Sequence, residues 1–166
     1  MLKPEDLNDE QWQAVRDAPH YVILAVSAAG GSVFDEMLER AAGLEGVVSG
    51  LESTHPLLQK IAASDQIMKA QQDTRDWIHT LNREHRNATS LQVKALDTLR
   101  AACAAIQQAG GADDLTRYGE FVHGIALRVA RSAREGDVLG LGGEIVSKSE
   151  SDFIARVAEI VGIESA

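Results

Sequence analysis

The stretch that decides the fold is LTRYGEFVHGIALRV, which spans residues 115–129. Its large apolar side chains recur at alternating spacings of three and four residues, at Leu115, Tyr118, Val122, Ile125 and Val129. This spacing places them on one face of an α-helix, whereas a half-buried strand would need alternation at every second residue. The stretch therefore predicts an amphipathic helix with one buried face.

The segment before this stretch has the same spacing. Leu96, Leu99, Cys103 and Ile106 follow one another at intervals of three, four and three residues, and Gly110–Gly111 separates the two segments. A connection this short favours antiparallel packing of the helices that it joins. The sequence thus predicts an antiparallel helix pair, in which Cys103 is a small buried residue without a chemical role.

Two helices are predicted before residue 30. Asn8 can cap a short first helix that runs through Asp17. Pro19 then occupies the first position of a second helix, where a missing N–H does no harm. The second helix contains the apolar stretch Tyr21–Val26, and Gly30–Gly31 ends it. β-branched residues in Tyr21–Val26 would also suit a strand, but the chain offers no second strand to pair with it.

Other helical segments complete the prediction. Each begins at a capping residue or a proline and has an apolar stripe. In the segment that starts at Ser64, a polar turn at residues 71–74 interrupts the apolar stripe and is predicted to be exposed or to bridge to another element. In the segment that starts at Asp35, Gly43, Gly46 and Gly50 leave the position of the helix end open. The predicted starts and inward residues are Asp35 with Met37, Leu38 and Ala41; Thr54 and Pro56 with Leu57, Leu58, Ile61 and Ala62; Ser64 with Ile67, Met68, Ile78 and Leu81; and the Ser147–Glu150 capping box with Phe153, Val157, Ile160 and Val161, ending near Gly162.

Composition agrees with a single all-α domain of six or seven helices over residues 1–166. Apolar residues make up 45% of the chain but aromatic residues only 4%, so the core must consist of aliphatic side chains. Alanine and leucine have the highest helix propensities. All 3 prolines precede residue 57, so nothing in the rest of the chain forbids a helix.

Charge and cysteine content restrict the expected environment. The chain has 25 acidic and 16 basic side chains and a net charge of -9, which disfavours binding to nucleic acid. Its single cysteine suits a reducing compartment, Met1–Asp6 does not resemble a signal peptide, and Tyr21–Val26 is too short to span a membrane. We expect a cytoplasmic protein without a cofactor, whose partner is another protein or a second copy of the chain.

Two parts of the chain, around residues 19–50 and 113–162, share one order of features. Each has an apolar helix with a histidine, then a glycine pair, then β-branched residues and an acidic helix. The histidines are His20 and His123, and the glycine pairs are Gly30–Gly31 and Gly142–Gly143. This order is what a duplicated helical hairpin would give, although two unrelated amphipathic hairpins can share it. We expect both histidines to be packed in the core rather than to act as catalytic bases.

The segments AVSAAGGSV at 25–33 and GGEIVSKSE at 142–150, with nearby acidic residues Asp35, Glu36 and Glu39, resemble the tellurite-resistance TerB-like family of small helical bacterial domains. In each half that family shows an Ala-rich helix, an Asp-Gly turn, a Val or Ile with Ser, and a Glu. The resemblance implies an all-helical fold and a non-catalytic binding or stress-response role. It also implies acidic turns that bind metal ions, but Gly30 and Gly142 replace the turn aspartates here.

Carboxylates near the glycine pairs are the candidate metal ligands. Hard cations such as Ca²⁺ and Mg²⁺ prefer carboxylate oxygens, and helix capping or solvent-facing positions explain the same residues equally well. The candidates are Asp35, Glu36, Glu39, Glu144 and Glu150.

An alternative function is a metal-dependent enzyme. Asp76 and His79, and likewise Glu120 and His123, have the i, i+3 spacing that di-iron helical bundles use. Against this hypothesis, the sequence supplies no further carboxylates on an apolar helix face. We expect these residues to be surface or partly buried polar groups, and the protein not to be an enzyme.

Two other features suggest binding rather than catalysis. Arg128, Arg131 and Arg134 recur every third residue and could hold an anion or an acidic partner, although a solvated helix face is the simpler interpretation. The loop with Leu139 and Leu141 could dock a partner or a second copy. Gly140–Gly143 lacks both the terminal glycine of the dinucleotide fingerprint and the Lys-Ser/Thr of a P-loop, so we exclude a phosphate loop.

Overall fold

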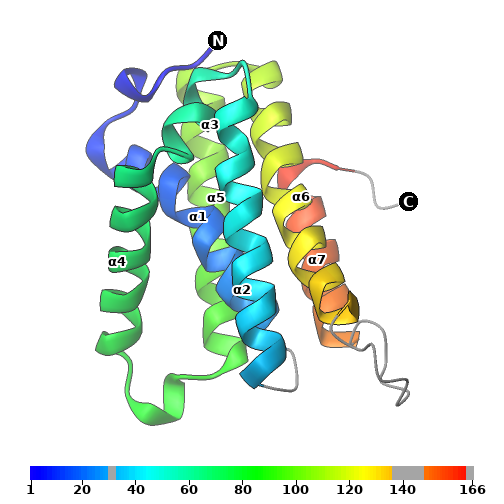
Figure 1. Cartoon of the computed structure of the whole chain (residues 1–166). Coiled ribbons are helices and arrows are strands. Elements are labelled where there is room, and N and C mark those ends of the chain that lie inside the picture. The colour runs from blue at the N-terminus through cyan, green and yellow to red at the C-terminus, as the bar shows by residue number, and fades with distance from the viewer. Residues whose placement is uncertain (30–32, 136–147, 164–166) are drawn as a thin grey trace.

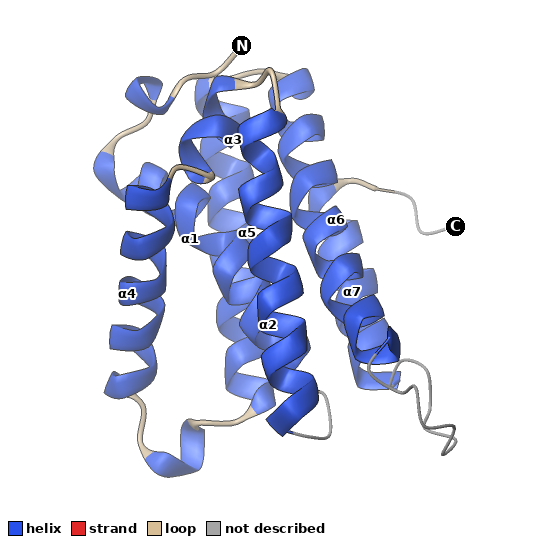
Figure 2. Cartoon of the chain, viewed as in Figure 1, coloured by secondary structure: helices blue, strands red, loops and turns tan. Residues whose placement is uncertain are grey.

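The computed structural model describes residues 1–29, 33–135 and 148–163, with the backbone alone at 33–38 and 133–135. Within these residues it contains seven α-helices, three 3₁₀ turns and no strand, which confirms the all-α prediction (Figure 2). In chain order the elements are η1 (Pro4–Asp6), α1 (Asp9–Ser27), α2 (Val33–Val48), η2 (Ser49–Glu52), α3 (Pro56–Ile61), α4 (Ser64–Thr80), η3 (Arg83–His85), α5 (Ala88–Ala109), α6 (Ala112–Glu135) and α7 (Lys148–Val161).

The long helices run up and down in one bundle (Figure 1). Helix α1 lies at its centre and packs against α5, α6, α2, α4 and α7. The end of α1 and the start of α2 lie at the lower end of the bundle, as do the end of α6 and the start of α7 (Figure 1). In both predicted hairpins the first helix thus ends, and the second begins, at the same end of the bundle, and the duplication itself stays a prediction.

The prediction of two helices before residue 30 is wrong, because α1 is one continuous helix. Asn8 caps it as expected: its side chain accepts from the Gln11 N–H at 2.9 Å, and the Gln11 side chain accepts from the Asn8 N–H at 3.0 Å. Pro19 lies inside the helix and is buried, not at a first turn. A proline there removes one helical hydrogen bond, since residue 19 has no N–H for the carbonyl of Val15.

A side chain from α6 replaces the hydrogen bond that Pro19 removes. The hydroxyl of Tyr118 donates to the backbone carbonyl of Val15 at 2.9 Å. Tyr118 is completely buried, and this burial raises its pKa well above the ordinary value of 10.0. The phenol therefore stays protonated and satisfies a carbonyl that would otherwise be buried without a donor.

The predicted apolar stripes form the core. Leu96, Leu99, Cys103 and Ile106 of α5 are buried, as are Tyr118, Val122, Ile125 and Val129 of α6, with Leu115 half-buried. Helices α5 and α6 contact each other and run in opposite directions, as expected, although α5 packs chiefly against α1 (Figure 1). Burial raises the pKa of the Cys103 thiol to about 11, in keeping with a structural cysteine.

Helix α2 differs from its prediction in its start and in one inward residue, while the sequence leaves its end open. It begins two residues before Asp35, it exposes Ala41, and it continues through Gly43 and Gly46 to Val48. The predicted inward residues Met37 and Leu38 lie outside the described side chains. Gly43 and Gly46 lie inside the helix, on the side that faces the neighbouring helices. A Cβ at Gly43 would lie 2.6 Å from Ile23 Cγ1 of α1 and 2.9 Å from Val129 Cγ2 of α6, so this position requires a residue without a side chain.

The remaining helices mostly follow the predicted stripes. Leu57, Leu58, Ile61 and Ala62 are buried in and beside α3, which follows His55 rather than Thr54. In α4, Ile67 is buried, but Met68 was wrongly predicted to be inward and is 69% exposed. In α7, Phe153, Val157 and Val161 are buried and Ile160 is half-buried, and the helix ends at Gly162 with a φ of 73°.

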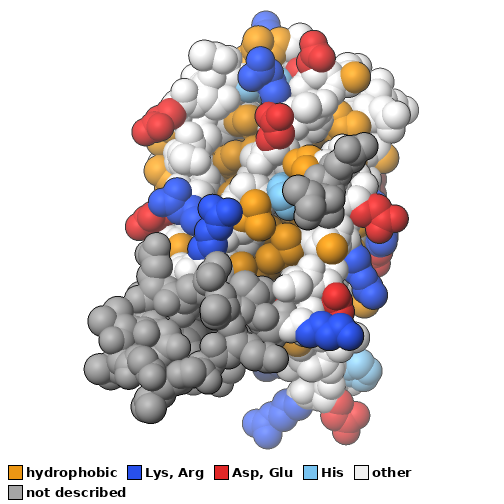
Figure 3. Space-filling model, turned by 90° about the vertical axis from the view of Figure 1, so that its right-hand side faces the viewer, with side chains coloured by type: hydrophobic (Ala, Val, Ile, Leu, Met, Phe, Trp, Pro, Cys, Tyr) orange, Lys and Arg blue, Asp and Glu red, His pale blue; other side chains and the backbone are white. Residues whose placement is uncertain are grey.

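The side formed by α6 and α7 shows how far the apolar residues reach toward the surface. Hydrophobic side chains lie in the middle of this face with charged ones around them (Figure 3). Several half-buried residues of these helices pack against the core, among them Phe121, Ile154 and Ile160. Among the described helices, none is long and apolar enough to cross a membrane.

The glycine contacts predict opposite effects of two Gly→Ala substitutions. Gly43→Ala should lower the free energy of unfolding by about 1–3 kcal/mol, because the new methyl group overlaps Ile23 and Val129. Gly124→Ala, in α6, places its methyl group where nothing beyond the adjacent residues and the backbone of α6 itself lies within 4 Å, and should raise the free energy of unfolding by about 0.5–1 kcal/mol through helix propensity. Urea unfolding followed by circular dichroism measures both, and equal effects of the two variants would contradict this packing.

Candidate functional site

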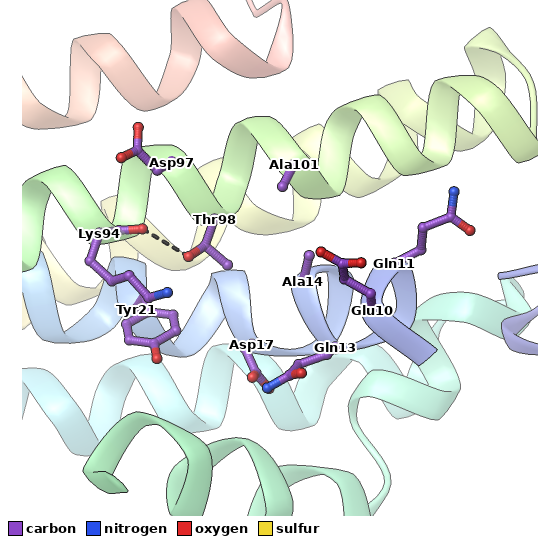
Figure 4. A pocket seen from close by; sticks show the side chains of 10 residues that line it. All are labelled: Glu10, Gln11, Gln13, Ala14, Asp17, Tyr21, Lys94, Asp97, Thr98 and Ala101. Carbon is purple, nitrogen blue, oxygen red and sulfur yellow. Dashed lines mark hydrogen bonds between the residues drawn. The ribbon is translucent and has the colours of Figure 1, made fainter. Parts of the chain in front are cut away.

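A groove of about 420 Å³ lies between α1 and α5 (Figure 4). Helix α1 supplies Glu10, Gln11, Gln13, Ala14, Asp17 and Tyr21, and α5 supplies Lys94, Asp97, Thr98 and Ala101. The small side chains of Ala14 and Ala101 leave room between the helices, while the longer ones form the rim. The groove is therefore open, with an alanine-lined middle and polar or charged side chains along its rim.

The charged rim of this groove is mostly acidic. Glu10 on α1 and Asp97 on α5 are both exposed, and Asp97 accepts from Arg100 at 2.9 Å in a surface ion pair. Such exposed pairs contribute little energy and exchange readily with other partners. Two different helices thus contribute a carboxylate to the rim, Glu10 from α1 and Asp97 from α5, at separate positions along the groove (Figure 4).

One end of the groove holds an ammonium group against two aromatic rings. Tyr21 of α1 and Trp77 of α4 meet edge to face, with ring centroids 5.6 Å apart and planes at 89°. The Lys94 ammonium lies 5.2 Å from the Tyr21 centroid and 5.6 Å from the Trp77 centroid. These distances are those of cation–π contacts. At this end of the groove, the position beside the two rings is therefore already occupied by the ammonium group of Lys94.

Buried charges lie behind the groove, between α1 and α4. Arg16, which is 5% exposed, donates through Nε to Asp17 Oδ1 at 2.7 Å and through Nη2 to Asp73 Oδ2. Lys69 donates to Asp73 Oδ1 at 2.8 Å. Burial raises the pKa of Asp17 even though Arg16 beside it acts in the opposite direction. The network joins α4 to α1, so the polar turn at 71–74 does bridge to another element, as one of the two predicted alternatives stated.

A second buried polar cluster holds the start of α6 against the rest of the fold. Asp114 Oδ1 accepts from the Leu2 N–H and from His55 Nε2, both at 2.7 Å, and Asp114 Oδ2 accepts from the Gly111 N–H at 3.0 Å. Burial acts to raise the pKa of Asp114, but these hydrogen bonds together lower it below the ordinary value of 3.8. One carboxylate thus connects three separate parts of the chain.

The predicted metal ligands are described only in part. The side chains of Asp35, Glu36 and Glu144 lie outside the described residues. Glu39 of α2 and Glu150 of α7 are buried, and each has an interaction partner, so neither lies on a solvated face. No three His, Cys, Asp or Glu side chains come together as a ligand set in the part of the chain that the structure describes. The proposed metal role stays a prediction.

The two carboxylate–histidine pairs do not form one site. Asp76 and His79 are exposed on α4. On α6, which lies on the other side of the bundle, Glu120 is exposed and His123 is half-buried (Figure 1). Burial lowers the pKa of His123 below the ordinary value of 6.5. The geometry of a di-iron centre, which needs both pairs in the interior, is absent at these four residues.

The other candidate residues have separate places. Arg128 donates to Glu45 at 2.9 Å across α6 and α2, and Arg131 is exposed, as expected for a solvated helix face. The side chain of Arg134 and the loop with Leu139 and Leu141 lie outside the described residues. His20 is buried, in agreement with the prediction of a core histidine, whereas His123, for which the same was predicted, is only half-buried.

Sequence reasoning did not find the Arg16 network or the Asp114 cluster. Arg16 and Asp73 are 57 residues apart, and His55 and Asp114 are 59 apart, so no local pattern connects them. A signal for the first was present: Arg16 and Asp17 stand between apolar neighbours, Val15 and Ala18, which indicates burial on at least one side.

Comparisons with known proteins identify no relative: no family model, no curated protein and no solved structure matches this chain.

The Asp114 cluster predicts an acid-dependent loss of stability. Asp114→Asn should lower the free energy of unfolding by about 1–3 kcal/mol at pH 7, because charge-assisted hydrogen bonds are lost. Since the folded-state pKa of Asp114 is lowered, the contribution of its charge is complete above the unfolded value of 3.8 and disappears as the pH falls below it. The difference between wild type and variant should therefore shrink in that range.

Urea unfolding at a series of pH values measures this difference. Asp113→Asn is the matched control, because Asp113 is the exposed neighbour in the same helical turn, and it should change stability little. A wild-type-to-Asp114→Asn difference that stays constant between neutral and acid pH would contradict the role assigned to the charge.

Proposed function

We propose that this chain is a non-catalytic helical binding module of TerB-like type that acts in stress response, and that the α1–α5 groove binds a positively charged segment of a partner protein. The stress-response part rests on the resemblance of residues 25–33 and 142–150. The binding part rests on one observation, an open groove whose rim carboxylates, Glu10 and Asp97, come from two helices.

The electrostatics of the whole chain support a cationic partner. A net charge of -9 attracts basic segments over a distance of about 8 Å at physiological salt. Within the groove, a lysine or arginine of the partner can pair with Glu10 or Asp97. Complementary rim charges of this kind mostly increase the association rate and the specificity.

The groove also contains an example of how a cation is recognised. Lys94 places its ammonium against Tyr21 and Trp77. The backbone carbonyl of Lys94 accepts from the Thr98 hydroxyl at 2.8 Å (Figure 4). A partner's cation can lie farther along the groove, away from the Lys94 ammonium, where Gln13 and Glu10 offer side-chain oxygens (Figure 4). Aromatic and carboxylate groups are together suited to alkyl chains that end in a charge.

Titration of the full chain with a lysine-rich peptide tests the proposal. The peptide should shift the amide NMR signals of α1 and α5 residues that line the groove, and the same peptide with glutamate in place of each lysine should not. The double variant Glu10→Gln/Asp97→Asn should weaken binding about three- to tenfold, since each exposed pair contributes up to about 1 kcal/mol.

A charge-matched control separates the groove from the general negative charge. Glu52→Gln/Glu120→Gln also removes two exposed carboxylates, but outside the groove, and should change affinity less than about twofold, because charges more than a Debye length away are largely screened. Equal weakening by both double variants, or signal shifts spread evenly over the surface, would contradict the proposed site.

A further inference from the structure

A second cavity, of about 350 Å³, lies between α1, α2 and α4. Helices α2 and α4 both pack against α1, which forms the floor between them (Figure 1). The residues that line this cavity are His20, Ile23 and Leu24 of α1, Arg40, Ala41 and Leu44 of α2, and Gln71, Thr74, Arg75 and Ile78 of α4. Side chains from three helices therefore line one cavity, which is open to solvent on one side.

The charge of this cavity is opposite to that of the chain. Arg40 and Arg75 stand on opposite walls, and no Asp or Glu is among the described residues that line it. Acidic side chains outnumber basic ones by 25 to 16 in the whole sequence, so an acid-free lining with two arginines is unexpected. The planar guanidinium groups of both arginines are suited to carboxylate or phosphate oxygens, whatever else they also contact.

The floor of the cavity offers a buried histidine. His20 is only 5% exposed, and its Nε2 has no hydrogen-bond partner among the described residues. Burial, together with the nearby Arg16 charge, lowers the pKa of His20 to about 4, so the ring is neutral at pH 7. A buried polar nitrogen without a partner costs free energy, which a ligand that reaches it would recover.

The remaining walls are apolar. Ile23 and Leu24 on the floor, Leu44 on α2 and Ile78 on α4 present aliphatic side chains, and Ala41 leaves room between them. The volume of the cavity lies near the lower end of the range of about 300–1,000 Å³ that is typical of small-molecule sites. An inorganic anion would use the arginines but leave these walls in contact with water.

We propose that the α1–α2–α4 cavity binds a small organic anion, a carboxylate with a short aliphatic chain. The carboxylate lies between Arg40 and Arg75 and accepts hydrogen bonds from them. The aliphatic chain packs on Ile23, Leu44 and Ile78, and the complex brings a polar atom or an ordered water to His20 Nε2. This site is separate from the α1–α5 groove and takes a ligand of the opposite charge.

Calorimetric titration of the full chain with hexanoate, acetate, hexan-1-ol and inorganic phosphate tests the assignment. Hexanoate should bind saturably. Acetate should bind at least about tenfold more weakly, because each buried CH₂ contributes about 0.8 kcal/mol. Hexan-1-ol, which has the chain without the charge, should also bind more weakly. Phosphate binding as tight as that of hexanoate would overturn the role of the aliphatic walls.

Arg75→Gln is the informative variant, because Arg75 is exposed and its removal should leave the fold intact. It should weaken hexanoate binding about fivefold or more, in line with the loss of one charge-assisted contact. Arg156→Gln, which removes an exposed arginine from α7 outside the cavity, is the matched control and should leave affinity unchanged. Equal affinities of the two variants would overturn the proposal.

The imidazole of His20 gives a second, independent readout in the unmodified protein. Its ¹⁵Nε2 NMR signal should move on titration with hexanoate at concentrations at which the weaker ligand hexan-1-ol leaves it in place. A ¹⁵Nε2 signal that hexanoate leaves unchanged would place the ligand elsewhere and overturn the assignment. Binding of the lysine-rich peptide at the α1–α5 groove is measured separately, so either proposal can fail while the other holds.

Discussion

The hydrogen bond from the Tyr118 hydroxyl to the Val15 carbonyl allows the central helix to exist in one piece. Pro19 lies in the middle of α1 and deprives Val15 of its helical donor, a defect that would normally end or kink a helix. Because α6 brings a buried phenol to that carbonyl, α1 continues to Ser27. The defect in one helix thus also fixes the position and rotation of another, since only one register of α6 places Tyr118 there.

The continuity of α1 determines where its side chains meet the neighbouring helices. Asp17 and His20, three residues apart on either side of Pro19, line different cavities, the α1–α5 groove and the α1–α2–α4 cavity. Arg16 pairs with Asp17 and contributes to the lowered pKa of His20, so one buried cation influences both. If α1 broke at Pro19, the α1–α5 groove and the α1–α2–α4 cavity would have no fixed position relative to each other. The groove with its acidic rim and the cavity with its two arginines can therefore lie on two sides of the single helix α1.

Helical periodicity predicted most of the fold but few of its specific contacts. The stripes of α5 and α6 were correct because spacings of three and four bury one face wherever the partner lies. The predictions failed at residues whose local conformational preference is overridden by contacts with residues far away in the chain. Pro19 favours a helix start by its local preference, but Tyr118 of α6 supplies the missing hydrogen-bond donor. Gly43 left the helix end open, but it lies inside α2 because Ile23 and Val129 leave no space for a side chain there. Of the candidate site, the sequence indicated only a bridge at residues 71–74, because the partner, Arg16, is far away in the chain.

A double-mutant cycle at Pro19 and Tyr118 tests this central contact most directly. Tyr118→Phe should cost about 1–3 kcal/mol in the free energy of unfolding, because the Val15 carbonyl stays buried without a donor. In a Pro19→Ala background residue 19 regains its N–H, so the same Tyr118→Phe change should cost at least about 0.5 kcal/mol less. Urea unfolding of the four proteins gives this coupling. Purely additive effects would contradict the account, and a smaller cost in the Pro19→Ala background would support it.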